Sequence, residues 1–326
     1  MTVLVTGAAG FIGFHTSKAL LARGDKVIGI DNLNDYYDVS LKEARLNQLR
    51  EQDNFVFEGL DIADREAMEN FGKHHPEITR VVHLAAQPGV RYSLINPYAY
   101  TRTNVEGHMC VLELCRHLEG LKHLVYASTS SVYGANKSQP FSVGDPTEHP
   151  VSLYAATKKS MELMSHTYAH LYRIPQTGLR YFTVYGPWGR PDMSPIIFTR
   201  KILAGEPLPV FNHGDMRRDF TYIDDIVSGT LACLDRPPVD DGEAVPCRVY
   251  NIGNQRSENL MDFIGLIEKN LDRKAEFDFL PMQPGDVQET YADIKAARRD
   301  FGYDPKTTIE QGIPKFIRWY RDFYGG

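Results

Sequence analysis

The chain of 326 residues has little cysteine, no excess of positive charge and no long apolar run. Its four cysteines, Cys110, Cys115, Cys233 and Cys247, form no C-x-x-C pair, so the sequence suggests neither a metal site nor a disulfide framework. Scattered free thiols fit a reducing cytoplasm. The formal net charge of −6 gives no reason to expect nucleic acid as a partner. No apolar run approaches the roughly 20 residues that span a bilayer, and no signal peptide precedes the first strand, so we expect a cytoplasmic protein without membrane association.

Strand-like and helix-like segments alternate through the first half of the chain. Strands are expected at residues 2–6, 26–30, 55–58, 80–84, 121–127 and 177–182, and helices at 11–23, 97–117 and 152–172. Repeated strand–helix units form a parallel sheet that is covered on both faces. The pattern therefore predicts an α/β fold of the Rossmann type with a doubly wound parallel sheet.

The pattern changes beyond residue 184, where prolines become frequent and the elements become shorter. We expect residues 1–184, together with about 220–254, to form a dinucleotide-binding domain. Residues 185–219 and 255–326 are expected to form a smaller α/β region that binds the substrate. A strand at residues 249–252 is expected to return to the main sheet.

A glycine-rich turn follows the first strand and opens a helix. Its glycines are Gly7, Gly10 and Gly13, with Phe11 and Ile12 between the last two. Glycine lets the backbone turn tightly and approach a pyrophosphate, and the helix N-terminus offers free N–H groups to that anion. The spacing is GxxGxxG, which differs from the usual GxGxxG fingerprint, and such turns also occur in proteins that bind no nucleotide.

Asp31 ends the second strand, near the position of an acid that binds the adenosine ribose. A carboxylate accepts hydrogen bonds from both ribose hydroxyls and repels a 2′-phosphate. Asn32 and Leu33 supply no compensating cation, so the sequence favours NAD over NADP. The alternative is that Asp31 only starts a turn.

Other candidates at the cofactor carry weaker signals. Asp61, next to Ile62, follows the third strand and is expected at the adenine edge, and Ala85, Ala86 and Gln87 follow the fourth strand, where small side chains let the backbone approach a dinucleotide. Ordinary loop polarity explains either segment about as well. The expected cofactor residues are completed by Asn104, Ser128, Tyr154, Lys158 and Tyr181.

Tyr154 and Lys158 are four residues apart in an expected helix and therefore share one face. A free tyrosine has a pKa of about 10, which is too high for a base at neutral pH. A nearby ammonium and a cationic nicotinamide favour the phenolate, and a drop of about three units corresponds to roughly 4 kcal/mol. The pattern predicts a catalytic pair, although a buried tyrosine beside a surface lysine gives the same spacing.

The fifth strand ends in the hydroxyl run Ser128, Thr129, Ser130 and Ser131. Ligands sit at the carboxyl ends of strands in sheets of this kind. These hydroxyls are candidates to hold a sugar hydroxyl, a carboxylate or the catalytic tyrosine, but Ser/Thr runs also serve simply as loops or caps.

Several stretches together resemble the extended short-chain dehydrogenase/reductase family of nucleotide-sugar enzymes over nearly the whole chain. They are the GxxGxxG turn, STSSVYG at 128–134, the YxxxK pair and RYF at 180–182. Longer strings are most similar to the UDP-glucuronate 4-epimerase subgroup: DNLNDYY at 31–37, AQPGVRYS at 86–93, FTVYGPWGRP at 182–191 and RDFTYIDDI at 218–226. The resemblance implies bound NAD, a UDP-sugar substrate and a homodimer through the helices at 97–117 and 152–172.

The resemblance also implies roles for individual residues. Tyr154 would take the proton from the sugar O4, Lys158 would bind the nicotinamide ribose, and Thr129 occupies the position of the family's catalytic Ser/Thr. Transient oxidation of C4, rotation of the 4-keto sugar and return of the hydride would convert UDP-glucuronate to UDP-galacturonate. The expected substrate residues are Arg91, Thr129, Ser130, Ser131, Thr183, Arg190, Arg218 and Asp286, with Arg218 matching the arginine that clamps the diphosphate. Gln283 stands where some relatives carry arginine.

Rival functions remain on the same scaffold. A neutral UDP-hexose 4-epimerase is the main alternative, although Thr183 replaces the asparagine of UDP-galactose 4-epimerases. Dehydratases and UDP-glucuronate decarboxylases carry an acid near Thr129, where this chain has Ser130 and Ser131. An intact set of Thr129, Tyr154 and Lys158 argues against a non-catalytic NAD-sensing protein.

Overall fold

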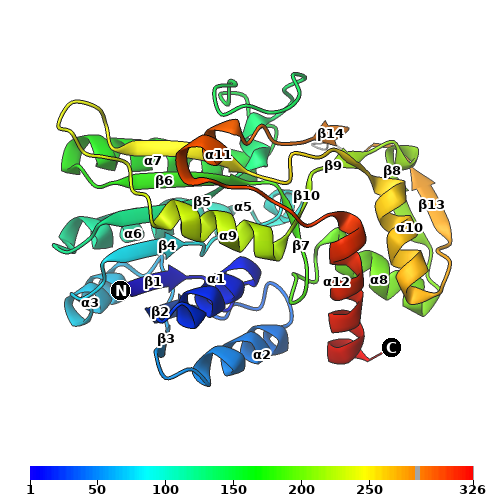
Figure 1. Cartoon of the computed structure of the whole chain (residues 1–326), viewed down its shortest axis with the longest axis horizontal. Coiled ribbons are helices and arrows are strands. Elements are labelled where there is room, and N and C mark those ends of the chain that lie inside the picture. The colour runs from blue at the N-terminus through cyan, green and yellow to red at the C-terminus, as the bar shows by residue number, and fades with distance from the viewer. Residues whose placement is uncertain (283–286, 326) are drawn as a thin grey trace.

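The centre of the molecule is a seven-stranded parallel sheet (Figure 1). The structure, a computed structural model, describes residues 1–282 and 287–325. In spatial order the strands are β11 (Cys247–Ile252), β6 (Gln176–Tyr181), β5 (His123–Thr129), β4 (Arg80–His83), β1 (Thr2–Thr6), β2 (Lys26–Asp31) and β3 (Phe55–Gly59). The predicted doubly wound Rossmann-type sheet is confirmed, and so is the returning strand, because β11 pairs with β6.

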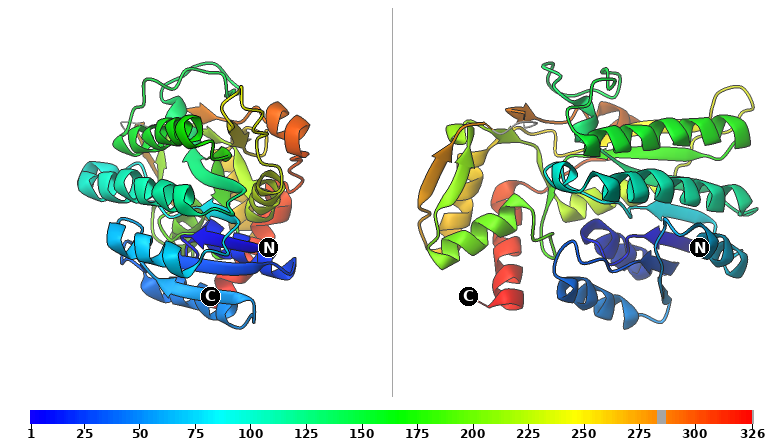
Figure 2. Two further views of the ribbon diagram at one scale, coloured as in Figure 1. Left: turned by 90° about the vertical axis from the view of Figure 1, so that its left-hand side faces the viewer. Right: turned by 180° about the vertical axis from the view of Figure 1, so that it is seen from behind.

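Helices cover both faces of this sheet, as the end-on view of Figure 2 shows. Side chains alternate along a strand, so Val3 and Val5 of β1 face one apolar cluster and Leu4 faces the other. The first cluster is closed by α1 (Phe11–Ala22), α2 (Val39–Arg50) and α9 (Ile223–Leu234). The second is closed by α3 (Arg65–His74), α6 (Gly107–His117) and α7 (Leu153–Tyr172).

The strand order reverses between β1 and β4. From β1 the sheet grows through β2 to β3 on one side, and then through β4, β5, β6 and β11 on the other. Crevices at such a switch point, beyond the carboxyl ends of the strands, bind ligands in open α/β sheets.

The segment predicted as a helix at 97–117 is helical throughout and contains a π-helical turn. A short helix, α4 (Tyr92–Ile95), is followed by α5 (Pro97–Tyr100), by the π-helical turn η1 (Thr101–Glu106) and then by α6. The helix predicted at 97–117 is confirmed, with a π-helical turn inside it, where Asn104 turns its side chain to the backbone of Gln87. π-Helical turns of this kind often occur at functional sites.

The remaining elements gather at the end of the molecule that the carboxyl ends of the sheet strands face (Figure 1). Their strands are β7 (Thr183–Tyr185), β8 (Leu208–Phe211), β9 (Arg217–Arg218), β10 (Phe220–Tyr222), β12 (Glu258–Asn259), β13 (Phe277–Leu280) and β14 (Glu289–Thr290). Their helices are α8 (Ser194–Ala204), α10 (Leu260–Leu271) and α12 (Ile309–Tyr324), while α11 (Lys295–Phe301) lies near β11. In the part of the chain that the structure describes, no helix is long and apolar enough to cross a membrane.

Candidate active site

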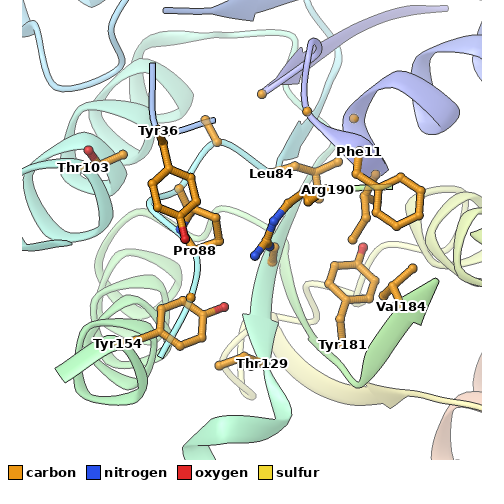
Figure 3. Close-up of a pocket in the computed structure, with 18 of the residues that line it drawn as sticks. Phe11, Tyr36, Leu84, Pro88, Thr103, Thr129, Tyr154, Tyr181, Val184 and Arg190 are labelled. Atoms are coloured by element: carbon orange, nitrogen blue, oxygen red, sulfur yellow. The ribbon is translucent and has the colours of Figure 1, made fainter. Parts of the chain in front are cut away.

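A cavity of about 490 Å³ lies beyond the carboxyl ends of the central strands (Figure 3). Most of the residues singled out from the sequence line it. They are Gly7, Gly10, Phe11, Ile12, Gly13, Asp31, Asn32, Asp61, Ile62, Ala85, Ala86, Ser128, Thr129, Ser130, Ser131, Tyr154, Lys158, Tyr181, Thr183 and Arg190. The fold therefore brings the glycine-rich turn, the Tyr154–Lys158 pair and the hydroxyl run around one space.

Four of the expected site residues do not line this cavity, and a fifth lies outside the described residues. Gln87 and Asn104 lie behind its wall, where the Asn104 side chain accepts a hydrogen bond from the Gln87 N–H (2.7 Å) and donates to the Thr157 hydroxyl (3.0 Å). Arg91 lies over the Phe211 ring, and Arg218 donates to the carbonyl of Gln288 at 3.0 Å. The segment 283–286, which includes Gln283 and Asp286, is outside the described part of the chain.

The glycine-rich turn is packed too tightly for side chains at two of its glycines. Gly7 has a φ of +71°, and a Cβ there would lie 2.8 Å from the Ala85 nitrogen. A Cβ on Gly13 would lie only 2.0 Å from the Gly7 carbonyl oxygen. Glycine therefore lets the first turn of α1 pack directly against the loop. The N-terminus of α1 is then open toward the cavity.

Asp31 is buried beside this turn. Its carboxylate accepts hydrogen bonds from the N–H groups of Ala9 (3.1 Å) and Leu33 (2.9 Å). Burial raises its pKa, while Lys42 and those two backbone bonds act in the opposite direction. Although the sequence neighbours of Asp31 carry no cation, α2 places Lys42 and Arg45 close enough to affect it.

Tyr154 and Lys158 stand in the first two turns of α7. The Ser152 hydroxyl caps this helix by accepting a hydrogen bond from the Ala155 N–H (3.1 Å), as N-cap serines do. The Lys158 ammonium donates to the carbonyl of Ala127 in β5 (2.8 Å). Burial lowers the pKa of Lys158 to about 7.

The electrostatics of Tyr154 differ from the sequence-based expectation. Burial raises the pKa of its phenol, and this is opposed by a contact with the Thr129 hydroxyl and by the charge of Arg190. Lys158, whose ammonium donates to the Ala127 carbonyl, is not among the causes of this shift in the chain alone, and its effect on the phenol beside a bound cofactor stays a prediction. The cation that lowers the pKa of Tyr154 is Arg190, which lies on a different segment.

The hydroxyl run divides between two environments. Ser128 donates to the Glu162 carboxylate (2.6 Å), which also forms a buried ion pair with Arg180. Thr129, by contrast, accepts from the Ser131 N–H and lies 3.3 Å from the Ser131 hydroxyl, both at the end of β5. Ser128 lines the cavity but gives its hydroxyl to the buried Glu162 carboxylate, whereas the hydroxyls of Thr129 and Ser131 contact each other at the cavity.

Arg190 enters the cavity from the loop after β7. Figure 3 shows its guanidinium and the Tyr154 phenol pointing into the same space, with Thr129 nearby. The Asp192 carboxylate pairs with two nitrogens of Arg190, at 3.0 and 2.7 Å. The Tyr36 hydroxyl donates to the same carboxylate at 3.0 Å, so a three-residue cluster holds Arg190 at the wall.

Sequence reasoning missed several residues that line the cavity. Those with polar side chains are Asn34, Tyr36, Tyr37, Lys42 and Thr103. Tyr36 and Tyr37 lie inside the DNLNDYY string, which was a usable signal, but Lys42 has no motif of its own. In the described parts of the chain, 1–282 and 287–325, no group of three or more His, Cys, Asp or Glu side chains is placed to hold a metal ion.

Comparisons with known proteins agree with this geometry. Residues 3–253 match the model of the NAD dependent epimerase/dehydratase family. The chain is 48% identical to UDP-glucuronate 4-epimerase 4 of Arabidopsis thaliana, over all of this chain and 76% of the relative. It superposes on the crystal structure of a UDP-glucuronic acid 4-epimerase from Bacillus cereus, in complex with UDP-glucuronic acid and NAD, with a TM-score of 0.91 and 36% identity over 99% of this chain and 100% of the other. A UDP-glucose 4-epimerase of Thermotoga maritima, solved with UDP-glucose, gives 0.87 and 32% over 99% and 100%.

Proposed function

Because the chain belongs to the NAD-dependent epimerase/dehydratase family, we propose that it inverts C4 of UDP-glucuronate to give UDP-galacturonate, reversibly. One observation carries the proposal. Tyr154, Lys158 and a cluster of hydroxyls stand at the same cavity as a glycine-rich helix N-terminus and a buried ribose-binding carboxylate. Relatives of 47–48% identity that are named UDP-glucuronate 4-epimerases support this choice of sugar.

The residues around the cavity fit NAD. The open N-terminus of α1 suits a pyrophosphate, and the lack of room for a Cβ at Gly7 and Gly13 keeps the backbone exposed to it. Asp31 would accept hydrogen bonds from the adenosine ribose, and Asp61 with Ile62 would face the adenine. When bound, NAD accepts a hydride from C4 of the sugar and later returns it.

The chain's own groups then handle the proton and the orientation. Tyr154 takes the proton of the O4 hydroxyl, and Arg190 makes this easier because its charge favours the phenolate. Thr129 holds O4 through its hydroxyl. Lys158, held at the Ala127 carbonyl, is placed for the nicotinamide ribose.

The carboxylate of the sugar needs its own site. A 4-keto uronate is a β-keto acid, which loses carbon dioxide when its C5–C6 bond stands perpendicular to the carbonyl. Thr129, Ser131 and Thr183 line the cavity, and hydroxyls donate several hydrogen bonds to one carboxylate. Together with Ser130 they would hold it in an unproductive orientation.

The UDP part of the substrate would occupy the smaller α/β region. Residues 185–219 and 255–326 are proposed to bind UDP, with Arg218, Arg91 and Asp286 near the diphosphate or uridine. Residues 1–184 and about 220–254 would form the NAD-binding domain. For Arg190, one of the expected substrate residues, the pairing with Asp192 and the effect on Tyr154 favour a place near the sugar.

A neutral UDP-hexose is the second candidate substrate, because the T. maritima structure was solved with UDP-glucose. The hydroxyls of Ser130, Ser131 and Thr183 favour the uronate. A cytoplasmic location is also proposed, since all four cysteines are free thiols.

The test is to incubate the purified protein with UDP-glucuronate and with UDP-glucose and to separate the products by chromatography. We expect UDP-galacturonate, and little UDP-galactose. Tyr154→Phe, which removes only the ionisable oxygen, should lower turnover at least about 100-fold with the fold intact by circular dichroism. UDP-galactose as the major product would reject the uronate assignment, and near-native turnover of Tyr154→Phe would reject the base.

A further inference from the structure

We propose that Arg45 is a positioning residue, which ties the glycine-rich turn to the loop 187–190 and thereby holds Arg190 beside Tyr154. The inference rests on the proposed function only for the role of Tyr154. Arg45 belongs to α2 and does not line the cavity. Its action is therefore indirect.

Arg45 is a fully buried cation. One terminal nitrogen donates to the Ala9 carbonyl and to the Tyr37 hydroxyl, both at 2.8 Å. The other donates to the carbonyls of Trp188 (2.7 Å) and Gly189 (3.1 Å). A buried guanidinium is costly unless it is well bonded, so these four bonds fix three separate segments relative to one another.

At one end, Arg45 holds the glycine-rich turn. The Ala9 carbonyl is bound by Arg45 and the Ala9 N–H by Asp31, so both sides of this residue are restrained. Tyr37, which contacts Arg45 through its hydroxyl and its ring, belongs to the segment after Asp31. Displacing Arg45 would therefore loosen both the glycine-rich turn and the segment after Asp31.

At the other end, Arg45 holds the loop that carries Arg190. The two carbonyls that it binds belong to the residues directly before Arg190 in the chain. Trp188 has a φ of +62°, a conformation that L side chains rarely adopt. Its ring packs against Phe14, Trp319 and Phe323, with centroids 5.7, 5.5 and 5.0 Å away, and His15 binds the Pro187 carbonyl at 2.9 Å.

The chemistry of arginine suits this role and that of lysine does not. A guanidinium is a planar fork that presents several donors in fixed directions, whereas an ammonium is a point charge on a flexible stem. Arg45→Lys keeps the charge near Asp31 but lacks the second nitrogen that reaches the Trp188 and Gly189 carbonyls. The substitution therefore separates geometry from charge.

Tryptophan fluorescence reports on the surroundings of this loop. The chain has only two tryptophans, Trp188 of the loop and Trp319, and their rings pack against each other. In Arg45→Lys we expect a red-shifted emission and stronger acrylamide quenching, with an unchanged far-ultraviolet circular dichroism spectrum. Leu46→Ala is the control, because Leu46 is buried on the same helix but gives no hydrogen bond to the loop. Arg45→Gln, which keeps a planar donor group, serves if the lysine variant does not fold. This readout needs no turnover, so it tests the link even if the proposed substrate is wrong.

Kinetics test whether the link acts through Arg190. Because Arg190 favours the phenolate, its displacement should move the acid limb of the kcat profile to higher pH and lower kcat about 10- to 100-fold. Leu46→Ala should leave that limb in place. Combining Arg45→Lys with Arg190→Met should lose little more than Arg190→Met alone. A native emission spectrum in the folded variant, an unmoved acid limb or fully additive losses would each overturn the proposal.

Discussion

Around Asp31, single charges decide which dinucleotide the cavity prefers. Asp31 is buried with Lys42 and Arg45 near it, and Lys42 donates to the backbone and side-chain oxygens of Asn34 (2.6 and 2.9 Å). The native carboxylate repels a 2′-phosphate. Replacing Asp31 by alanine leaves the charge of Lys42 on the cavity wall, which a 2′-phosphate can meet.

We therefore predict that Asp31→Ala lowers the preference for NAD over NADP by about 10-fold or more, or at least 1.4 kcal/mol. Calorimetric titration with each cofactor measures the ratio. Asp61→Ala is the matched control, since it removes the same charge at the adenine, which both cofactors share. A native protein that binds NADP more tightly than NAD would contradict the ribose assignment.

The sequence predicts the candidate catalytic residues better than it predicts their pKa shifts. The four-residue spacing of Tyr154 and Lys158 was enough to place both at the cavity, because helix geometry fixes which residues share a face. Arg190 approaches Tyr154 from a loop with no periodic pattern, so the effect of Arg190 on the pKa of Tyr154 could not be predicted before the fold was known. The same holds for Lys42, which no motif identifies.

We propose that the end of β5 separates epimerisation from decarboxylation. Thr129 caps the 3₁₀ turn η2 (Ser130–Tyr133) and thereby groups its hydroxyl with that of Ser131. A glutamate there would bring a second negative charge to the sugar carboxylate and weaken its grip. We predict that Ser131→Glu or Thr183→Val raises the ratio of UDP-pentose to UDP-galacturonate, measured by mass spectrometry.

Ser128→Ala is a matched hydroxyl deletion, since Ser128 is turned to Glu162, and it should leave the product ratio unchanged. Two outcomes would reject protection by the hydroxyl cluster. One is that Ser131→Glu and Thr183→Val both stay wholly epimerising. The other is that both lose activity without forming any pentose.

Asp219 holds together several short segments that lie outside the seven-stranded sheet. Fully buried, its carboxylate accepts from the N–H groups of Asn254, Gln255 and Ala292 and from the Thr221 hydroxyl. Burial raises its pKa from 3.8 to about 6, against those hydrogen bonds. The folded state thus favours the protonated form of Asp219. The resulting contribution to the free energy of unfolding is fully present below pH 3.8 and is lost as the pH rises through 6.

Asp219→Asn removes this titration. We predict that the free energy of unfolding of the native protein, relative to the variant, falls between about pH 4 and 6 by on the order of 3 kcal/mol. Urea denaturation across this range measures it. The lost hydrogen bonds add an offset that does not vary with pH, so a difference that is flat with pH would contradict the raised pKa.

Elements with a clear period were predictable and irregular ones were not. The strands, α7 and the helix at 97–117 follow from alternation and from a 3.6-residue period, but the π-helical turn at 101–106, where Asn104 bonds to the Gln87 backbone, does not. Likewise β5 runs to Thr129, two residues beyond its predicted end, because Ser128 and Thr129 pair with Arg180 and Tyr181 of β6.

At the scale of the whole molecule, apolar side chains are exposed on the neighbouring segments α4, α5 and α7. Leu94, Ile95 and Tyr98 of the α4–α5 segment are 72%, 77% and 82% exposed, and Leu163 and Leu171 of α7 are each 59% exposed. Exposed apolar patches of this kind mark interaction surfaces. We propose that two copies of the chain pair through the helices at 97–117 and 152–172, which the resemblance implies, together with the neighbouring α4.

Light scattering should therefore give the mass of a dimer, and Leu163→Glu should shift it toward the monomer at the same concentration, because a charge would be buried in the interface. Val239→Glu places the same charge on another exposed apolar residue (79%) and should leave the dimer intact. A native protein of monomer mass would contradict this pairing.

In the proposed mechanism, one bound NAD both takes and returns the hydride at C4. The most direct measurement uses UDP-glucuronate deuterated at C4, in ordinary water, with the product analysed by mass spectrometry and NMR. We expect UDP-galacturonate that keeps its deuterium at C4. Loss of the label to solvent would contradict it, because it would show that C4 loses a proton and not a hydride.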